Sequence, residues 1–404
     1  MLGENNISIK LIIIGIVWPP DTFLQRLIRG LIDAGIEVTV ACDEKPSHEW
    51  LSHPNFRWLW TPTWNMSAPN RLWSLISLIF CGLLRAPKAV WQIINLRAES
   101  FNARLKTWYR LLPFVGHRWD VTYFPWNSAA IEYLTLSDMG TPVVVSCRGS
   151  QINVAPHDPN RQAVRQELST NFQKAAAVHC VSEAIKMEAT YCGLDPRKAW
   201  VIRPAVDPGF FHPGERLKSG NGIFNIISTG DLIWRKGSEY ALLAVRNLLD
   251  QGIPAQFHII GDGPEYSRLL YTIGDLNLDG KVLLHGRLAP LEVRNRLQEA
   301  DAFLFSSLSE GIANAVLEAM ACGLPVVTTD CGGMTEAVTD GVEGLVVPVR
   351  DPEAMAGALA RLATDPALSS RLGQAARQRI LKDFSLDRQV AKFIEMYLHV
   401  LEKD

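Results

Sequence analysis

The residues of this sequence best suited to chemistry are two glutamates that stand eight positions apart. Glu310 follows a short apolar run, and Glu318 lies on the predicted helix after it, where Asn314 shares its face. Carboxylates accept hydrogen bonds from hydroxyls, and the free N–H groups at a helix start attract phosphate. The pair taken alone is equally typical of two solvated carboxylates. In this setting it suits a nucleotide diphosphate carrying a sugar, with Glu318 on a ribose diol and Glu310 on a sugar hydroxyl.

The two glutamates belong to a predicted strand–loop–helix–strand unit. Residues 302–305 are an apolar run typical of a buried parallel strand, and apolar residues from Ile312 onward recur at helical spacing. Gly323 is placed to end that helix, Pro325 prevents its continuation, and residues 326–327 begin the next strand. Open α/β sheets bind ligands beyond the carboxyl ends of their strands, so the predicted site is this loop and helix start.

A basic pair stands in a second phosphate-binding context. Arg235 and Lys236 follow a predicted strand and precede a helix expected from about Ser238. Arg235 taken alone also fits a solvated loop cation. The turn at Gly263 follows another predicted strand, and glycine there lets the backbone approach a ligand.

The string from Glu310 to Val327, EGIANAVLEAMACGLPVV, closely resembles the donor-binding signature of retaining glycosyltransferase family 4. Residues 330–338 and 340–348 also match that family. The resemblance implies an α/β fold of the GT-B type, in which two Rossmann-like domains face each other across a cleft. It also implies a nucleotide-sugar donor on the second domain, an acceptor on the first, and transfer with retention at the anomeric carbon.

The same resemblance implies roles for individual residues. Arg235 and Lys236 would hold the donor diphosphate, and the segment at Arg287 would contact the base edge. The predicted catalytic residues are Glu310, Lys236 and Arg148. The predicted donor-binding residues are Arg235, Lys236, Gly263, Arg287, Leu288, Glu310, Gly311, Ile312, Ala313, Asn314 and Glu318. No cofactor and no metal site are predicted, because basic side chains would stabilise the leaving diphosphate and Asp-x-Asp occurs nowhere in the chain.

Three positions depart from the family pattern. Asp231 stands where the family carries an arginine on the diphosphate, and the first loop lacks the family's glycine pair. Arg148 stands where much of the family carries a histidine near the transferred sugar. Arg148 suits a phosphate or an acidic acceptor, or else a loop salt bridge. His157 is a candidate substitute for the histidine, although a loop histidine beside prolines is usually a surface residue.

Length and composition indicate two folded domains. The chain has 404 residues, 48% hydrophobic and 20% charged, and a net charge of −2 gives no reason to expect nucleic acid. Its 7 cysteines are scattered, which favours a reducing cytoplasm and neither zinc nor a disulfide framework. The predicted acceptor domain is 1–212 and the predicted donor domain is 213–385, with a linker at 213–222 and a last helix, 386–404, that crosses back to the first domain.

Residues 71–118 carry eight Lys or Arg and a single acid, Glu99, together with Trp73, Trp91 and Trp108. A basic, tryptophan-bearing helical region of this kind can lie on an anionic membrane surface. The alternative is that these helices pack on the first sheet and line the acceptor cleft. The two interpretations are compatible with each other. A peripheral location on the inner face of the cell membrane and a lipid-linked acceptor follow from the first reading.

The resulting prediction is a metal-independent retaining hexosyltransferase. It would move a sugar from a UDP- or GDP-type donor to a glycan or lipid-linked acceptor in surface polysaccharide or lipopolysaccharide biosynthesis. Two alternatives stay open. Nucleotide-sugar 2-epimerases share the GT-B architecture but lack the string at 310–327 as it stands here. A non-catalytic nucleotide-sugar-binding protein is motivated by Arg148 and Asp231.

Overall fold

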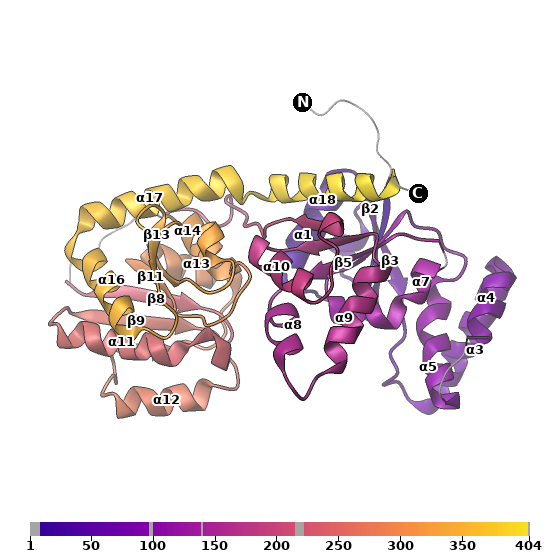
Figure 1. The fold of residues 1–404 in the computed structure, drawn as a ribbon, viewed down its shortest axis with the longest axis horizontal. Coiled ribbons are helices and arrows are strands. Elements are labelled where there is room, and N and C mark those ends of the chain that lie inside the picture. Colours follow the sequence, from indigo (N-terminus) through magenta and orange to yellow (C-terminus); the bar gives the residue numbers. More distant parts are fainter. Residues whose placement is uncertain (1–8, 97–99, 139, 215–221, 403–404) are drawn as a thin grey trace.

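The computed structural model describes residues 9–96, 100–138, 140–214 and 222–402, which form two α/β domains placed end to end (Figure 1). The first domain is built on a parallel seven-stranded sheet of order β3-β2-β1-β4-β5-β6-β7. Its strands are β1 (Lys10–Ile13), β2 (Glu37–Cys42), β3 (Phe56–Trp60), β4 (Val121–Phe124), β5 (Val143–Cys147), β6 (Ala177–Cys180) and β7 (Ala199–Val201).

The second domain is built on a parallel six-stranded sheet of order β10-β9-β8-β11-β12-β13. Its strands are β8 (Phe224–Thr229), β9 (Ala255–Ile260), β10 (Val282–Leu284), β11 (Ala302–Phe305), β12 (Val326–Thr329) and β13 (Gly344–Val347). Central strands such as β5 and β11 are buried at every residue because helices cover both faces. The two sheets confirm the predicted fold class.

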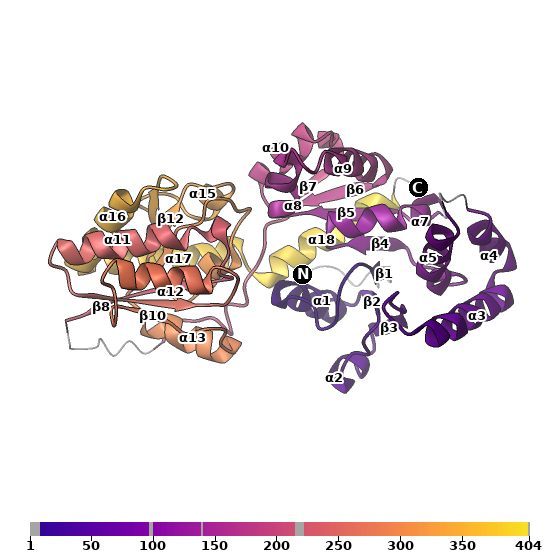
Figure 2. The same ribbon diagram turned by 90° about the horizontal axis from the view of Figure 1, so that it is seen from below.

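Helices flank the first sheet, and α3, α4 and α5 project at the end of the molecule farthest from the second domain (Figure 2). The helices of this domain are α1 (Thr22–Asp33), α2 (His48–Leu51), α3 (Ala68–Arg85), α4 (Pro87–Ile94), α5 (Phe101–Leu111), α6 (Asn127–Ala130), α7 (Thr135–Asp138), α8 (Ser150–Asn153), α9 (Ala163–Lys174) and α10 (Glu183–Tyr191). Short 3₁₀ turns include η1 (Leu112–Phe114), η2 (Ile131–Tyr133), η3 (Ala155–His157) and η4 (Pro196–Lys198).

The second sheet is enclosed in the same way. Its helices are α11 (Ser238–Asp250), α12 (Tyr266–Asp275), α13 (Pro290–Glu299), α14 (Asn314–Ala321), α15 (Met334–Ala337), α16 (Pro352–Thr364) and α17 (Pro366–Asp383). A 3₁₀ turn, η5 (Trp234–Lys236), precedes α11, and Gly237 between them has φ of 60°. The predicted helix start at about Ser238 is confirmed.

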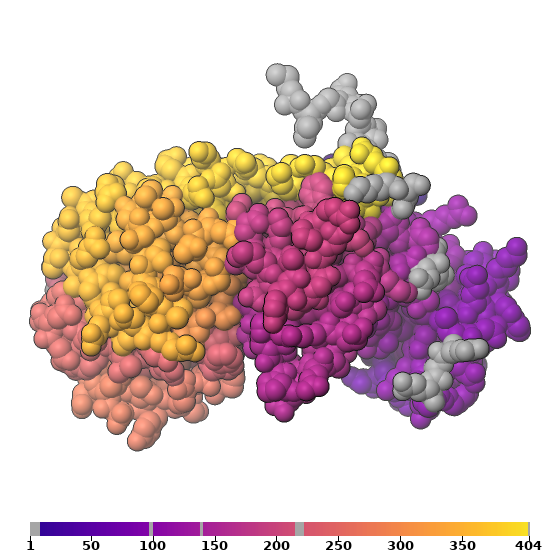
Figure 3. Space-filling model, viewed as in Figure 1, coloured from indigo at the N-terminus to yellow at the C-terminus, as the bar shows by residue number. Residues whose placement is uncertain are grey.

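The last helix, α18 (Leu386–Leu401), returns to the first domain and lies along it (Figures 1 and 3). Its apolar residues join the core that α1 forms with the first sheet, and they are Val390, Phe393, Met396, Tyr397 and Val400. Where the chain passes between the domains, Val206 pairs with Ser385 in a parallel bridge. Most of the predicted linker, 215–221, lies outside the described residues.

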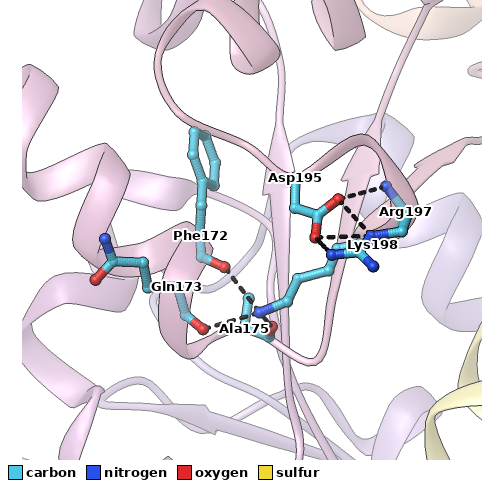
Figure 4. Close-up of polar contacts among 6 residues, drawn as sticks. All are labelled: Phe172, Gln173, Ala175, Asp195, Arg197 and Lys198. Carbon is cyan, nitrogen blue, oxygen red and sulfur yellow. Dashed lines mark hydrogen bonds and ion pairs between the residues drawn. The ribbon is translucent and has the colours of Figure 1, made fainter.

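Lys198 connects the end of η4 to the carboxyl end of α9 in the first domain (Figure 4). Its ammonium donates to the carbonyls of Phe172, Gln173 and Ala175 at 3.2, 2.8 and 2.8 Å, so it caps the carboxyl end of α9. Burial lowers the pKa of Lys198. A cation suits this position because the last carbonyls of a helix carry partial negative charge. The contact ties η4 and β7 to α9.

One predicted boundary moves. Strand β1 ends at Ile13, and the chain turns at Gly15, where φ is 81°. The helix expected from Ile312 begins at Asn314. Among the described residues, no helix has both the length and the apolar content needed to cross a membrane.

Candidate active site

Two loops at the carboxyl ends of β8 and β11 bring the predicted catalytic pair together. The Lys236 ammonium donates to Glu310 Oε1 at 2.5 Å and lies 5.1 Å from the centre of the Phe305 ring. Ser307 Oγ lies 3.2 Å from the same carboxylate oxygen, and the Arg235 guanidinium lies 4.0 Å from it. These side chains are at most about one-fifth exposed. A carboxylate and two cations therefore share one partly desolvated position.

Hydrogen bonds between the two loops fix this geometry. Ser306 Oγ donates to the Lys236 carbonyl at 3.0 Å, and Ser307 Oγ donates to the Arg235 carbonyl at 3.0 Å. The Leu308 N–H also donates to the Arg235 carbonyl, at 2.7 Å. The backbone of the basic turn is thus held by the loop that carries Glu310, and both cations are aimed from a rigid base.

The start of α14 adds backbone donors beside Glu310. Ala313 is its N-cap residue and offers no side-chain cap, so the first N–H groups of the helix keep their capacity for a ligand. Asn314 Oδ1 is buried without a hydrogen-bond partner among the described residues. Ile312 and Ala313 are buried, and both still belong to the loop before α14, although the helix was predicted from about Ile312.

Gly311 marks the contact between the two domains. A Cβ at this position would lie 2.7 Å from Val181 Cγ2, at the end of β6 in the first domain, and 3.4 Å from Ile185 Cγ1. Gly333 makes a similar approach to Ser182. The donor signature therefore presents glycine backbone to the other domain, because any side chain would hold the domains apart.

Glu318 forms an ion pair with a residue of the first domain that the sequence did not single out. Arg26, on α1, donates from Nη2 to Glu318 Oε1 at 2.8 Å, and both side chains are 16% exposed. Burial raises the pKa of Glu318, and Arg26 acts in the opposite direction. Among the described residues, no donor contacts Glu318 Oε2, so this oxygen keeps an acceptor site for a ligand. Helix α1 is simply amphipathic in sequence, so nothing local identified Arg26.

The remaining predicted donor residues border the same sheet edge. A Cβ on Gly263 would lie 2.5 Å from the Leu232 carbonyl oxygen, which explains the glycine there. Arg287 lies 3.8 Å from Asp231, and both side chains are more than two-thirds exposed. Leu288, next in the chain, packs against the core around α14. Arg287 thus stands beside the position where the family carries its arginine.

Arg148 lies at the carboxyl end of β5 and is bound only to neutral groups. It donates from Nε to Ser146 Oγ at 3.2 Å and from Nη2 to Tyr123 Oη at 3.4 Å. Ser146 in turn contacts His179 Nδ1 at 2.8 Å, and His179 Nε2 donates to the Ile202 carbonyl. Burial, with Arg148 nearby, lowers the pKa of His179 to about 3. The histidine is therefore neutral and orients the serine toward the arginine.

Two aromatic rings hold the Arg148 guanidinium in place. It lies 4.3 Å from the Phe23 ring centre and 5.7 Å from that of Trp126, and the two rings meet edge to face. No carboxylate of the described residues pairs with it, so the loop salt bridge expected as the alternative is not formed. His157 is exposed and contacts Glu188 at 3.3 Å and the Tyr191 ring on α10, with no contact to Arg148.

Comparison with known proteins places this arrangement in a class. The structure of HepE from Anabaena in complex with UDP and glucose matches with a TM-score of 0.71 at 16% identity, covering 96% of this chain and 98% of that one. Sucrose-phosphate synthase from Thermosynechococcus elongatus matches with a TM-score of 0.74 at 17% identity, over 98% and 100%. The shared fold is that of the GT-B glycosyltransferases.

The sequence profiles of two domain families cover most of the chain. Residues 20–205 match the glycosyl transferase 4-like domain, and residues 216–379 match the glycosyl transferases group 1. A Salmonella typhimurium protein provisionally named as a colanic acid biosynthesis glycosyltransferase is 27% identical over 397 residues, or 93% of this chain and 96% of that protein. The chain belongs to the group 1 glycosyltransferases with a 4-like amino-terminal domain, and the family predicted from the signature at 310–327 is confirmed.

Proposed function

We propose that this glycosyltransferase moves a sugar from a nucleoside diphosphate donor, with retention, without a metal ion. The observation that carries the proposal is the Lys236–Glu310 contact, set between two strand ends and the uncapped start of α14. Donor diphosphate bound there would meet Lys236, Arg235 and free helix N–H groups. Glu310 would then exchange its contact with Lys236 for a sugar hydroxyl.

The chemistry follows from where charge develops. When the bond between the anomeric carbon and the diphosphate breaks, negative charge grows on the leaving phosphate oxygen. Preorganised cations and helix N–H groups stabilise that charge most strongly where water is excluded. The leaving phosphate takes the acceptor proton on the same face of the sugar, so the reaction needs no separate general base. A donor-site metal ion would duplicate the role of the two cations.

The biosynthetic setting is proposed from the relatives. Besides the Salmonella protein, an Erwinia amylovora protein named as an amylovoran biosynthesis glycosyltransferase is 34% identical over 215 residues, which cover 50% of this chain and 52% of that protein. Both names refer to exopolysaccharide synthesis. The acceptor proposed here is accordingly a growing glycan of a surface polysaccharide, carried on a lipid.

The exposed surface of the projecting helix α3 is further evidence for an acceptor carried on a lipid. Its exposed apolar side chains recur along one face, and they are Leu72, Trp73, Ile76, Phe80, Leu83 and Leu84. We call this surface the α3 ridge. Residues 68–118 carry a single acid, Glu99, against several cations that include Arg71, Arg85 and Lys88. An apolar stripe edged by cations fits an anionic membrane leaflet, which we propose as its occupant.

Thermal unfolding with UDP, GDP, ADP and TDP tests the donor site. A nucleotide at about 100 times its Kd stabilises by about 2.7 kcal/mol, so one of the four should raise the midpoint clearly. The shift should shrink in Glu318→Ala. Incubation of the matching labelled nucleotide sugar with a lipid extract should then give a radiolabelled glycolipid. An epimerised nucleotide sugar would instead establish the isomerase alternative, and binding without turnover the non-catalytic one.

Vesicle flotation tests the α3 ridge. The protein should float with vesicles of phosphatidylcholine and phosphatidylglycerol at low salt and less with phosphatidylcholine alone. The variant Trp73→Glu/Phe80→Glu should remain at the bottom of the gradient with the unbound protein. Met187→Glu/Tyr191→Glu is the matched control, because these residues are also exposed, at 69% and 68%, but lie on α10. Equal flotation of both variants would contradict the proposed membrane contact.

A further inference from the structure

A pocket of about 280 Å³ opens where the chain crosses between the two domains, and we call it the crossover pocket. One wall is the segment 201–205 after β7, and the other is the junction of α17 and α18 (Figure 1). Gln389 joins the two walls by donating from Nε2 to the Arg203 carbonyl at 3.0 Å. The volume of the pocket is close to the lower end, about 300 Å³, of pockets that hold small molecules. None of its lining residues belongs to the donor loops described above.

Cations dominate the lining of the crossover pocket. Its basic lining residues are Arg203, Arg379, Arg388 and Lys392. Asp383 is the only acid among the lining residues that the structure describes, and it lies 2.9 Å from Arg379 Nη1 and 3.9 Å from Arg388 Nη1. Because two guanidiniums share this one carboxylate, the pocket keeps positive charge for an anion. Arg388 and Lys392 stand four residues apart, so they share a face of α18.

Two of these cations pair with acids outside the lining. Lys392 lies 3.2 Å from Glu395, and both side chains are more than half exposed, so solvent screens this pair. Arg203 lies 2.8 Å from Glu336, whose side chain is only 16% exposed. The charge of Lys392 is therefore readily available to a ligand, whereas the Arg203–Glu336 pair is better shielded from water and contributes more to the structure.

Arg379 brings an unpaired donor to the pocket. Its Nη1 binds Asp383 and its Nη2 donates to the Glu336 carbonyl at 3.3 Å, but its Nε is buried and has no hydrogen-bond partner among the described residues. Buried N–H groups of folded proteins are normally bonded. A phosphate can accept more than one hydrogen bond from a single guanidinium, so it is the anion that suits this arginine best.

Glu336, on α15, connects the crossover pocket to the donor signature. One of its carboxylate oxygens accepts from Arg203, and the other accepts from the Ala184 N–H at the start of α10, at 3.2 Å. Three residues before Glu336, a Cβ on Gly333 would lie 2.6 Å from the Gly311 carbonyl oxygen. A change at Arg203 therefore reaches both the contact between the domains and the loop that carries the donor signature.

We propose that the crossover pocket binds a compact phosphate, either inorganic phosphate or a small monoester, and that this ligand weakens nucleotide binding. The phosphate group lies between Arg379, Arg388 and Lys392. A second anion beside Arg203 divides the attraction of that guanidinium and repels Glu336, so the ion pair between the two residues weakens. The pocket itself is independent of the proposed transfer function, and only the effect on the nucleotide rests on it.

Calorimetric titration with inorganic phosphate and with glycerol 3-phosphate tests the pocket, and glycerol is the uncharged control. The protein should bind phosphate and not glycerol. Tighter binding of glycerol 3-phosphate identifies a monoester as the ligand, whereas equal or tighter binding of the ion identifies free phosphate. Arg388→Gln/Lys392→Gln should weaken binding by about tenfold or more, because two charge-assisted contacts are lost. Lys236→Met should keep the wild-type affinity, because the donor loops are not part of the pocket.

The matched control is Arg371→Gln/Lys382→Gln, which removes the same charge from α17 outside the lining of the pocket. Its affinity for the phosphate should stay within about twofold of wild type. Equal weakening in the two double variants would mean general charge attraction and would overturn the proposal. Loss of binding in Lys236→Met would also overturn it, since the phosphate would then occupy the donor loops. A wild-type protein that binds neither phosphate at millimolar concentration would overturn it as well.

Nucleotide titration tests the effect of the bound phosphate. At a phosphate concentration that just saturates the wild-type pocket, the Kd of the nucleotide should rise by about fivefold or more, as for typical couplings between two sites. The rise should shrink in Arg388→Gln/Lys392→Gln. A full rise in that variant would mean direct competition at Lys236 and would overturn the coupling, as would an unchanged Kd in the wild type. A protein that binds phosphate but no nucleotide would count against the proposed donor site and not against the crossover pocket.

Discussion

Two pairs of cations, one pair in each domain, are held in opposite ways. In the second domain, the proposed donor side, Lys236 is bound to Glu310 and Arg287 lies beside Asp231, so each cation lies close to a carboxylate. In the first domain, the proposed acceptor side, Arg148 lies on Phe23 and Arg71 lies on Trp64, with aromatic faces in place of acids.

This difference indicates two kinds of ligand binding. A cation paired with an acid must be released or shared when a ligand arrives, so binding is coupled to a rearrangement of contacts. A cation on an aromatic ring keeps most of its attraction for an anion and needs no exchange. The proposed donor domain is thus arranged for exchange of contacts on ligand binding, and the proposed acceptor domain for constant attraction.

Removing Lys236 should give the largest effect. Lys236→Met should lower kcat by about 10²- to 10³-fold, because one preorganised donor at the developing charge is lost. Arg246→Gln is the control, since Arg246 is paired with Asp250 on α11 away from the loops. Steady-state kinetics with the labelled donor measures both. A kcat within threefold of wild type in Lys236→Met would remove Lys236 from the reaction.

The Arg26–Glu318 ion pair tests the coupling between the domains. Arg26→Gln leaves a buried carboxylate without its cation, a cost of about 2 kcal/mol or a 30-fold loss of nucleotide affinity. Arg203→Gln is the control, because it breaks another contact between the domains, the 2.8 Å ion pair with Glu336. If both variants lose affinity equally, domain closure rather than the charge of Glu318 is responsible.

The same variant should change the pH dependence of donor binding. Burial already raises the pKa of Glu318, and Arg26 opposes the shift, so removing Arg26 raises this pKa further. A protonated carboxyl has lost half of its acceptor capacity for a ribose diol. Nucleotide affinity of Arg26→Gln should therefore fall as pH is lowered from 8 to 5, beginning at a higher pH than in wild type. Parallel pH profiles, measured by calorimetry, would contradict this role.

Arg148→Gln should act on the acceptor alone. The acceptor KM should rise by about tenfold, and the Kd of the nucleotide should stay unchanged, because Arg148 attracts an anionic group without touching the donor loops. Arg148→Lys should recover only part of the loss, since lysine lacks the flat guanidinium that lies on Phe23. An unchanged acceptor KM in Arg148→Gln would show that its charge serves only the fold.

Chelation should give the smallest effect. Dialysis against EDTA should leave the transfer rate within about twofold, because Lys236 and Arg235 already meet the leaving diphosphate. If EDTA lowered the transfer rate strongly and Mg²⁺ or Mn²⁺ restored it, a metal ion would take part in the reaction and the metal-independent proposal would be wrong.

The fold and the donor loops were predictable because their determinants are local. Buried runs such as 302–305 specify parallel strands, and the spacing of Glu310 and Glu318 follows directly from a loop and one helix. The contact between Lys236 and Glu310 required only that two strands be neighbours. The sequence could not show Arg26 beside Glu318, because that pair joins residues 292 positions apart through the arrangement of two domains.

The contacts of 71–118 and of Arg148 were harder to predict for a related reason. The basic, tryptophan-rich character of 71–118 was visible, but which cation lies on which ring depends on how α3 and α5 pack. Arg148 was recognised only as a departure from the family pattern. Its network through Ser146 and His179 combines residues of two strands, and spacing along the chain carries no trace of it.

The path of α18 sets the order in which the protein can be completed during synthesis. The first domain leaves the ribosome early, yet Phe393 and Tyr397 of its core are translated last. At elongation rates of about 5–20 residues per second, the first sheet waits on the order of tens of seconds for that helix. During this interval the apolar face of α1 stays uncovered. A chain cut short before α18 would therefore lose the earlier domain, not the later one.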